Sequence, residues 1–182
     1  MTSYADFLRG LWDDPKAVSA PTPSGQCLAK AIASEVNRAT PGLVVELGAG
    51  TGAVTAALLA HGIAEERLVV FENVPTFHEL LSRRFPKAQV LQADGFEFDH
   101  HLSPQTPVAA VVSGIPLLNH PASARARLIE TALDRQGPGG QFIQLSYGWW
   151  PPIPAGPRLS LARMRVLRNL PPAHVWTYRR RH

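Results

Sequence analysis

The stretch "LVVELGAGTG", Leu43 to Gly52, decides the fold of this 182-residue chain. An apolar run ends in a carboxylate, Glu46, and three closely spaced glycines follow at Gly48, Gly50 and Gly52. A tight glycine turn after the first strand of an open α/β sheet lets the backbone approach a ligand closely. A buried ionised carboxylate is costly unless a cation or hydrogen-bond donors meet it. The stretch therefore predicts a strand, a turn and a ligand whose charge suits Glu46.

Short apolar runs alternate with helical patterns along most of the chain. Strands are predicted at residues 43–47, 67–72, 88–93, 108–114 and 140–148, with helices at 52–62, 75–85 and 121–136. The last part of the chain predicts two further strands, joined through Asn169 to Pro172 in an antiparallel hairpin at one edge of the sheet. The predicted fold class is α/β, a doubly wound and mostly parallel sheet of seven strands.

The first 40 residues predict a helical extension that is separate from the sheet domain, residues 41–182. One short helix would place five apolar side chains on one face: Tyr4, Phe7, Leu8, Leu11 and Trp12. A second helix would carry Cys27, Leu28, Ile32 and Val36 on one stripe. The extension is expected to lie on a membrane interface, or instead to pack over the core or over the cofactor.

Composition limits the classes of protein to which the chain can belong. Eighteen Lys and Arg against fourteen Asp and Glu give a net charge of +4, and no acidic residue follows Asp134. Such a basic C-terminal part suits anionic phospholipid and nucleic acid equally well. No apolar run is long enough to span a bilayer, no secretory signal is recognisable, and Cys27 is the one cysteine. We therefore expect a cytoplasmic protein.

The glycine turn fits two kinds of cofactor. Gly48, Gly50 and Ala53 satisfy the dinucleotide pattern G-x-G-x-x-A, which would indicate a dehydrogenase. Glu46 argues against this interpretation, because a carboxylate beside the turn would repel an anionic pyrophosphate. S-adenosylmethionine carries an ammonium and a sulfonium, so the same carboxylate would attract it. We therefore predict S-adenosylmethionine as the cofactor.

The string E-x-G-x-G-x-G closely resembles the first motif of class I methyltransferases. This resemblance implies that Glu72 holds the ribose hydroxyls and that Asp94, in "LQADGFEF", contacts the adenine amino group. The sheet domain, residues 41–182, would then be the methyltransferase domain. The cofactor-binding residues expected on this basis are Glu46, Gly48, Ala49, Gly50, Gly52, Glu72, Asn73, Asp94 and Gly95.

The end of the fourth predicted strand, "VVSGIPLLNHP", bears on the methyl acceptor. Methyltransferases that act on a base amino group usually carry Asn-x-Pro-aromatic here. The aligned residues of this chain are Gly114, Ile115, Pro116 and Leu117, which supply neither the amide nor the ring. Adenine in nucleic acid is therefore a poor target despite the basic C-terminal part.

Nearly the whole chain resembles the bacterial soluble phospholipid N-methyltransferases. The resemblance rests on "FLRGLWDDPKAVSAPTPSGQCLAKAIAS", "ELGAGTGAVTAALL", "VVSGIPLLN", "GPGGQFIQLSYG" and "RNLPPAHVW". It implies stepwise N-methylation of phosphatidylethanolamine toward phosphatidylcholine. It also implies a phospholipid substrate, peripheral association with the anionic inner face of the cytoplasmic membrane, and no nucleic-acid partner.

Three residues are predicted to take part in the transfer itself: Ser113, Gly114 and Tyr147. Tyr147 ends the fifth predicted strand, where its ring could stabilise the ammonium that forms, or it could be a core tyrosine. His120 could accept the amine proton or be a solvated imidazole. His100 and His101 adjoin no further metal-ligand residues, so no metal site is predicted.

Some questions stay open at this point. Trp149 and Trp150, on a loop with four prolines that cannot be helical, could anchor to lipid or cover an apolar pocket. The alternatives to a phospholipid methyltransferase are an RNA adenine N6-methyltransferase and a non-catalytic lipid-binding protein with the same fold. The sequence does not determine the oligomeric state, the number of methylations or the proton acceptor.

Overall fold

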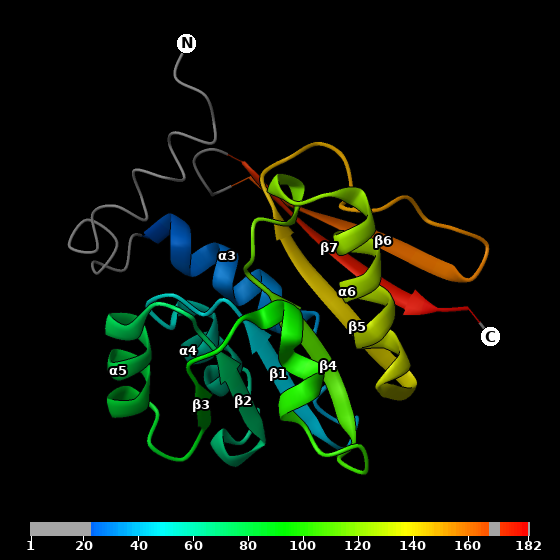
Figure 1. Cartoon of the computed structure of the whole chain (residues 1–182). Coiled ribbons are helices and arrows are strands. Elements are labelled where there is room, and N and C mark those ends of the chain that lie inside the picture. The colour runs from blue at the N-terminus through cyan, green and yellow to red at the C-terminus, as the bar shows by residue number, and fades with distance from the viewer. Residues whose placement is uncertain (1–22, 168–171, 182) are drawn as a thin grey trace.

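A computed structural model describes residues 23–167 and 172–181 of the chain (Figure 1). The helices are α3 (Pro23–Ser34), α4 (Ala53–Ala60), α5 (Pro75–Arg84) and α6 (Ala122–Asp134). The strands are β1 (Leu43–Leu47), β2 (Leu68–Phe71), β3 (Gln89–Leu91), β4 (Val108–Ser113), β5 (Gln136–Ser146), β6 (Leu159–Val166) and β7 (Ala173–Arg180). Three 3-10 helices are η1 (Glu65–Arg67), η2 (Gly95–His101) and η3 (Leu117–Asn119).

The seven strands form one sheet in the order β3-β2-β1-β4-β5-β7-β6. Neighbouring strands from β3 to β5 are parallel, whereas β7 runs antiparallel to both β5 and β6. The predicted doubly wound sheet with an antiparallel C-terminal hairpin is confirmed. The second strand of the hairpin, β7, pairs with β5, so the first strand, β6, forms the edge of the sheet.

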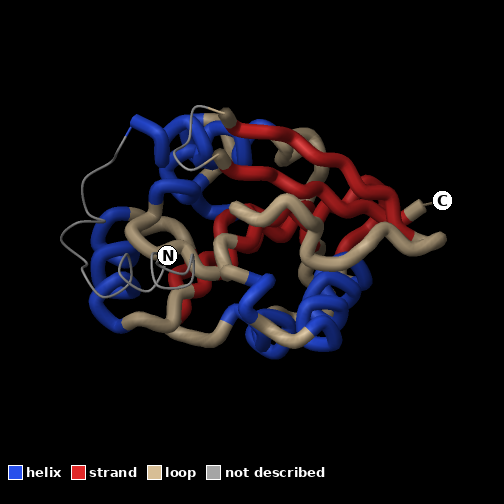
Figure 2. The backbone as a smooth tube through the Cα atoms, turned by 90° about the horizontal axis from the view of Figure 1, so that it is seen from above, coloured by secondary structure: helices blue, strands red, loops and turns tan. Residues whose placement is uncertain are grey.

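Helices cover both faces of the sheet, as Figure 2 shows. One face packs against α3, α4 and α5 through a core that includes Leu28, Leu58 and Leu81. The other packs against α6 and η2 through a core that includes Ile129 and Phe98. Because both faces are covered, β2 and β4 are buried along their whole length, which is why their sequences are continuous apolar runs.

The described part of the N-terminal extension, residues 23–40, packs into the same core as the sheet. Ile32 is 1% exposed, and the Thr177 hydroxyl of β7 donates a hydrogen bond of 2.7 Å to Glu35. The backbone N–H of Asn37 donates a hydrogen bond to the side-chain oxygen of Gln141, in β5. The amphipathic helix predicted around Tyr4 to Trp12 lies outside the described residues.

The chain order of the strands reverses between β1 and β4, which are neighbours in the sheet. In open α/β sheets, ligands bind beyond the carboxyl ends of the strands at this reversal. The glycine turn follows β1 directly, so it lies at this point. The loop between β5 and β6 is not helical, as its prolines predict. Among the described helices, none combines the length and the apolar character needed to cross a membrane.

Candidate active site

The glycine turn after β1 is held against the end of β2. The backbone N–H groups of Gly48 and Ala49 both donate to the carbonyl of Phe71, at 2.8 and 3.3 Å. Gly48, Gly50 and Gly52 have φ angles of 72°, 55° and 81°, in the left-handed region that favours glycine. A Cβ on Gly52 would also lie 2.7 Å from both Leu81 and Phe85 of the neighbouring helix end. Glycine is therefore required at these positions by backbone conformation, and at Gly52 by packing as well.

Glu72, the residue after β2, is tied to the glycine turn. Its carboxylate is 1% exposed and accepts hydrogen bonds from the Gly50 N–H at 2.7 Å and the Val74 N–H at 2.9 Å. These two donors come from the turn after β1 and the turn after β2. Glu72 thus joins the two loops whose ends face the sheet reversal.

Glu46, in β1, is buried behind the turn rather than in contact with solvent. It is 2% exposed, and the hydroxyl of Thr55 in α4 donates to it at 2.7 Å. Burial raises the pKa of Glu46 to about 7, against the lowering effect of the Thr55 hydrogen bonds, and the nearby charge of Glu72 adds to the rise. The carboxylate is therefore poised to change its charge near neutral pH.

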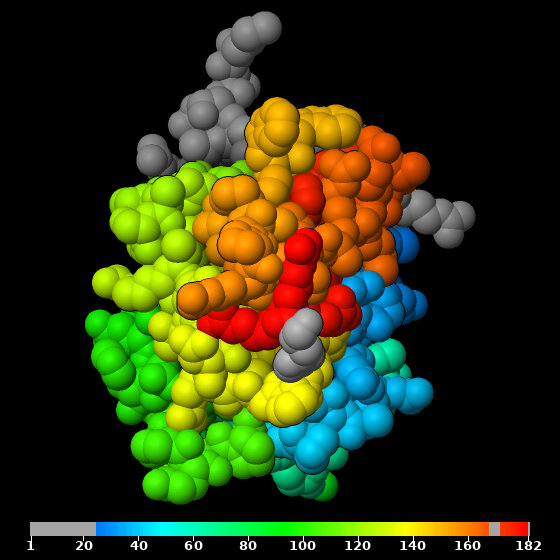
Figure 3. All heavy atoms as spheres, turned by 90° about the vertical axis from the view of Figure 1, so that its right-hand side faces the viewer, coloured from blue at the N-terminus to red at the C-terminus, as the bar shows by residue number. Residues whose placement is uncertain are grey.

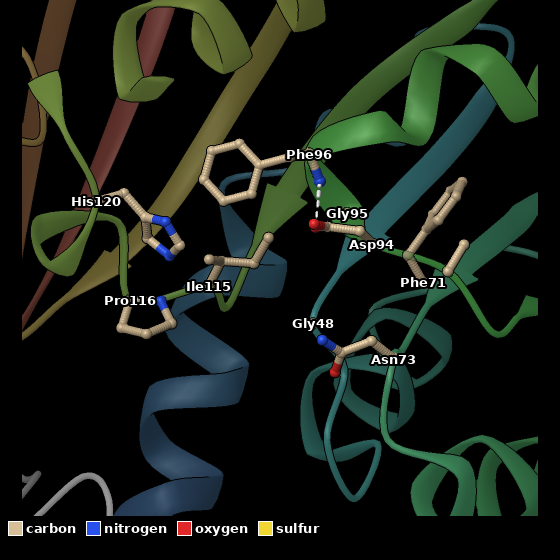
Figure 4. Close-up of a pocket in the computed structure, with 10 residues that line it drawn as sticks. Gly48, Phe71, Asn73, Asp94, Gly95, Phe96, Ile115, Pro116 and His120 are labelled. Atoms are coloured by element: carbon tan, nitrogen blue, oxygen red, sulfur yellow. Dashed lines mark hydrogen bonds between the residues drawn. The ribbon is translucent and has the colours of Figure 1, made fainter. Parts of the chain in front are cut away.

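A first cavity of about 220 Å³ opens beside the glycine turn. It is lined by Gly48, Phe71, Asn73, Ala93, Asp94, Gly95, Phe96, Ile115, Pro116 and His120 (Figure 4). The Phe96 ring lies against the His120 ring, with 4.6 Å between their centroids. The Phe96 N–H donates to Asp94 Oδ1 at 2.9 Å, which fixes the exposed carboxylate at the cavity wall. The cavity thus combines a fixed acid with aromatic and apolar walls.

Two glycines outside the turn keep the backbone walls close together. A Cβ on Gly95 would lie 2.8 Å from Ile115, and one on Gly114 would lie 2.7 Å from the Gly48 carbonyl. The Gly114 N–H also donates to the Leu47 carbonyl at 2.8 Å. The loop after β4 therefore packs directly on the glycine turn after β1.

A second cavity, of about 340 Å³, shares Pro116 with the first. It is lined by Gly114, Pro116, Leu117, Leu118, Asn119, Gln144, Leu145, Ser146, Tyr147, Gly148 and Pro152. None of these lining residues carries a charged side chain. The Gln144 amide group donates to the carbonyls of Ile115 and Leu145, so it joins the loop after β4 to the end of β5.

The structure brings most of the predicted site residues to one region but does not test their roles. Gly48, Asn73, Asp94 and Gly95 line the first cavity, and Gly114 and Tyr147 line the second. The other residues of the glycine turn lie outside the linings of both cavities. Ala49 donates its N–H to Phe71, Gly50 donates to Glu72, and Gly52 is the N-cap of α4.

Ser113 differs from the other two predicted catalytic residues. It is 1% exposed, it lines neither cavity, and its hydroxyl has no hydrogen-bond partner among the described residues. Its role stays a prediction. His120 lies in the wall of the first cavity, against Phe96, rather than in an open loop.

Sequence analysis did not single out Phe96 or Gln144. Phe96 lies in the 3-10 helix η2, which has no periodic pattern, although it follows Asp94 and Gly95 directly. Gln144 is a fully buried amide within an apolar strand. A buried polar side chain inside such a run usually has hydrogen-bond partners, and this was the signal that could have marked it.

One curated relative is a lipid N-methyltransferase. No protein-family model matches the chain. The ornithine lipid N-methyltransferase of Singulisphaera acidiphila is 27% identical over 155 residues, which cover 82% of this chain and 81% of that protein.

Solved methyltransferase structures share the fold at low sequence identity. TrmN from Thermus thermophilus superimposes with a TM-score of 0.67 at 16% identity; the match covers 91% of this chain but 52% of TrmN, about half its length. The 1,6-didemethyltoxoflavin-N1-methyltransferase of Burkholderia thailandensis, solved with S-adenosylhomocysteine, also gives 0.67, at 18% identity over 98% of this chain and 87% of that one. These structures show that the chain has the class I methyltransferase fold. With the E-x-G-x-G-x-G turn and the curated relative, the fold indicates an S-adenosylmethionine-dependent methyltransferase.

Proposed function

We propose that this methyltransferase transfers the methyl group to the amine of a membrane lipid headgroup. The observation that carries the proposal is the second cavity, which adjoins the first at Pro116 and has no charged lining residue. The similarity to an ornithine lipid N-methyltransferase supports the same class of acceptor. Ornithine lipid and phosphatidylethanolamine both present a primary amine, so the cavity suits either headgroup.

The residues of the first cavity fit S-adenosylmethionine, which supplies an electrophilic methyl group on a sulfonium. Asp94 offers a fixed carboxylate to the adenine amino group, between the apolar walls of Phe96 and Ile115. Glu72 is buried behind the turn, lines neither cavity, and accepts backbone N–H groups with both oxygens, so it holds the turn beside the cofactor. Its contact with the ribose hydroxyls stays a prediction. Asn73 lines the cavity beside it.

Glu46, when ionised, adds a negative charge from behind the turn. Its carboxylate does not line the first cavity, so its effect on a cation is exerted at a distance or through water. In a buried setting such an interaction is screened much less than at the surface. Because burial raises the pKa of Glu46 to about 7, a bound cation would favour the ionised form and release a proton.

The second cavity is suited to an amine that arrives uncharged. A protonated amine has no lone pair with which to attack the methyl group, and an uncharged lining does not stabilise the protonated form. Gly114 and Pro116 place this cavity next to the first, so the acceptor nitrogen can approach the methyl group in line. Tyr147 would present an aromatic ring to the ammonium that forms on transfer.

The proposal is tested with methyl-labelled S-adenosylmethionine and four separate acceptors. These are vesicles with phosphatidylethanolamine, vesicles with ornithine lipid, vesicles of phosphatidylglycerol alone, and RNA. We expect label in one or both amine lipids and none in phosphatidylglycerol, which has no amine. Label in adenosine of RNA with none in lipid would overturn the proposal in favour of the nucleic-acid alternative. Vesicle binding without affinity for the cofactor would indicate a non-catalytic lipid-binding protein.

A further inference from the structure

Large apolar side chains are exposed at the mouth of the second cavity. Trp149 is 64% exposed and Trp150 is 79% exposed, and they directly follow Gly148, which lines that cavity. Leu118, another lining residue, is 42% exposed. Figure 3 shows the segment after β5, in gold, projecting above the edge formed by β6 and β7. Exposed apolar groups gathered at one place, rather than scattered singly, indicate an interaction surface.

Trp149 belongs to a series of neighbouring rings and guanidinium groups. The Arg165 guanidinium lies over the Trp149 ring, 5.3 Å from its centroid. The His174 ring lies between the two tryptophans, with its centroid 5.4 Å from that of Trp149 and 5.9 Å from that of Trp176. Arg163 lies over Trp176 at 5.6 Å. Burial, and then the charge of Arg163, lower the pKa of His174, so the arginines supply the positive charge of this series.

Charge on this part of the molecule is positive and unbalanced. Arg163 and Arg165 are exposed on the edge strand β6, and neither has a carboxylate partner within the described residues. At the opposite end of the hairpin, by contrast, Arg180 is paired with Glu130 and Asp134 of α6. The chain from residue 135 to residue 182 contains no acidic residue.

We propose that the tryptophan–arginine surface, made by Trp149, Trp150, Arg163 and Arg165, docks on an anionic phospholipid bilayer. Tryptophan favours the headgroup region of a bilayer, and arginine is attracted to anionic headgroups. Docking in this way brings the mouth of the second cavity to the lipid surface. The inference rests on the proposed function in assuming a lipid acceptor, but it concerns how the protein reaches that acceptor.

The test measures co-sedimentation of the full chain with vesicles of phosphatidylglycerol and phosphatidylcholine, and with vesicles of phosphatidylcholine alone. We expect the double variant Trp149→Ala, Trp150→Ala to bind the anionic vesicles about tenfold more weakly or worse. The double variant Arg163→Gln, Arg165→Gln should bind the anionic vesicles about tenfold more weakly or worse, and the binding that remains should depend less on salt than that of the wild type. The matched control, Arg83→Gln, Arg127→Gln, removes the same charge from exposed positions on α5 and α6 and should bind like the wild type.

A parallel assay separates docking from chemistry. Each variant is given phosphatidylethanolamine or ornithine lipid dispersed in neutral detergent micelles, where docking on an anionic bilayer is not needed. Cofactor affinity and methyl transfer should then match the wild type, which also shows that the variants are folded. If the wild-type protein does not methylate lipid in micelles, while its vesicle binding depends on this surface, the proposed function fails and the docking proposal stands.

The opposite results would overturn the docking proposal alone. These are methylation of micellar lipid together with wild-type vesicle binding by both double variants, or no binding of the wild-type protein to anionic vesicles. A dimer in solution that is lost in the tryptophan variant, without vesicle binding, would also overturn it, because a second copy would then cover the surface.

Discussion

Glu72 accepts a hydrogen bond of 2.7 Å from the backbone N–H of Gly50, so the acid that follows β2 is bonded to the glycine turn that follows β1. The two residues are 22 positions apart in the chain. Their contact means that the carboxylate has a structural part before any ligand arrives. It keeps the glycine turn in the shape that leaves the first cavity open.

Glu72→Gln tests this contact. The amide keeps one acceptor oxygen, so either the Gly50 N–H or the Val74 N–H loses its partner. We expect S-adenosylmethionine to bind about ten- to a hundredfold more weakly by titration calorimetry, since a hydrogen bond to a charged group contributes about 1.5 to 3 kcal/mol. The control is Glu65→Gln, because Glu65 also accepts a backbone N–H at 2.7 Å, from Lys87, but has no hydrogen bond to the glycine turn. Equal affinities for both variants would contradict the account.

Glu46→Gln tests the effect of the buried carboxyl on stability. In the folded protein its pKa is raised from 4.5 to about 7, so the folded state binds the proton more tightly than the unfolded state. The contribution of Glu46 to the free energy of unfolding is therefore greatest below about pH 4.5 and falls as the pH rises to about 7. The total change is on the order of 3 kcal/mol. Denaturant unfolding across this window should show this slope in the wild type relative to the variant.

The same variant tests the electrostatic role of Glu46 in cofactor binding. Ionised Glu46 attracts a cation, so wild-type affinity for S-adenosylmethionine should rise as the pH passes through about 7. Glu46→Gln, which is neutral throughout, should lack this rise and should bind more weakly above neutral pH. A pH dependence that is the same in both proteins would show that Glu46 does not sense the cofactor.

Gly114→Ala tests the close contact between the loops after β1 and β4. The added Cβ would lie 2.7 Å from the Gly48 carbonyl, a backbone atom that cannot move aside cheaply. We expect the free energy of unfolding to fall by about 1 to 3 kcal/mol, with a loss of cofactor affinity. Gly156→Ala is the control, because a Cβ there meets nothing within 4 Å. Thermal unfolding of the two variants at the same midpoint would rule out the tight contact.

Gln144→Leu tests the hydrogen bonds by which Gln144 joins the loop after β4 to the end of β5, at the second cavity. The variant loses the hydrogen bonds to the carbonyls of Ile115 and Leu145, which should lower stability by about 1 to 2 kcal/mol. We expect kcat/KM for the lipid to fall about tenfold while the affinity for S-adenosylmethionine changes little.

The matched control for this variant is Gln141→Leu. Gln141 is another buried amide of β5, and it accepts from Asn37 away from both cavities. It should cost similar stability without the loss of activity. An equal loss of kcat/KM in both variants would mean that Gln144 acts only through stability.

The sequence predicted the central strands well because β1, β2 and β4 are buried on both faces. β1 agrees with its predicted bounds, Leu43 to Leu47, and the turn that follows was predicted from its glycines. The order of β6 and β7 was not predicted, since the hairpin pattern does not say which strand pairs with β5. Pairing β7 with β5 is a property of the tertiary packing.

The site was predicted only where it follows strand ends directly. Glu46, Glu72 and Asp94 were identified because each lies at or just after an apolar run. The hydrogen-bond partners of the two glutamates could not be predicted. Thr55 of α4 donates to Glu46 of β1, and Gly50 in the turn after β1 donates to Glu72 in the turn after β2. The second cavity joins residues of η3 with the end of β5, and no local pattern of the sequence records that contact.

The most direct measurement of the central claim is the position of the transferred methyl group. The wild-type protein is incubated with S-adenosylmethionine that carries a deuterated methyl group and with vesicles that contain phosphatidylethanolamine and ornithine lipid. Tandem mass spectrometry then locates the label in the product. The account predicts deuterated methyl on a headgroup nitrogen. Cofactor binding without any labelled lipid, or label on an oxygen of the lipid, would contradict it.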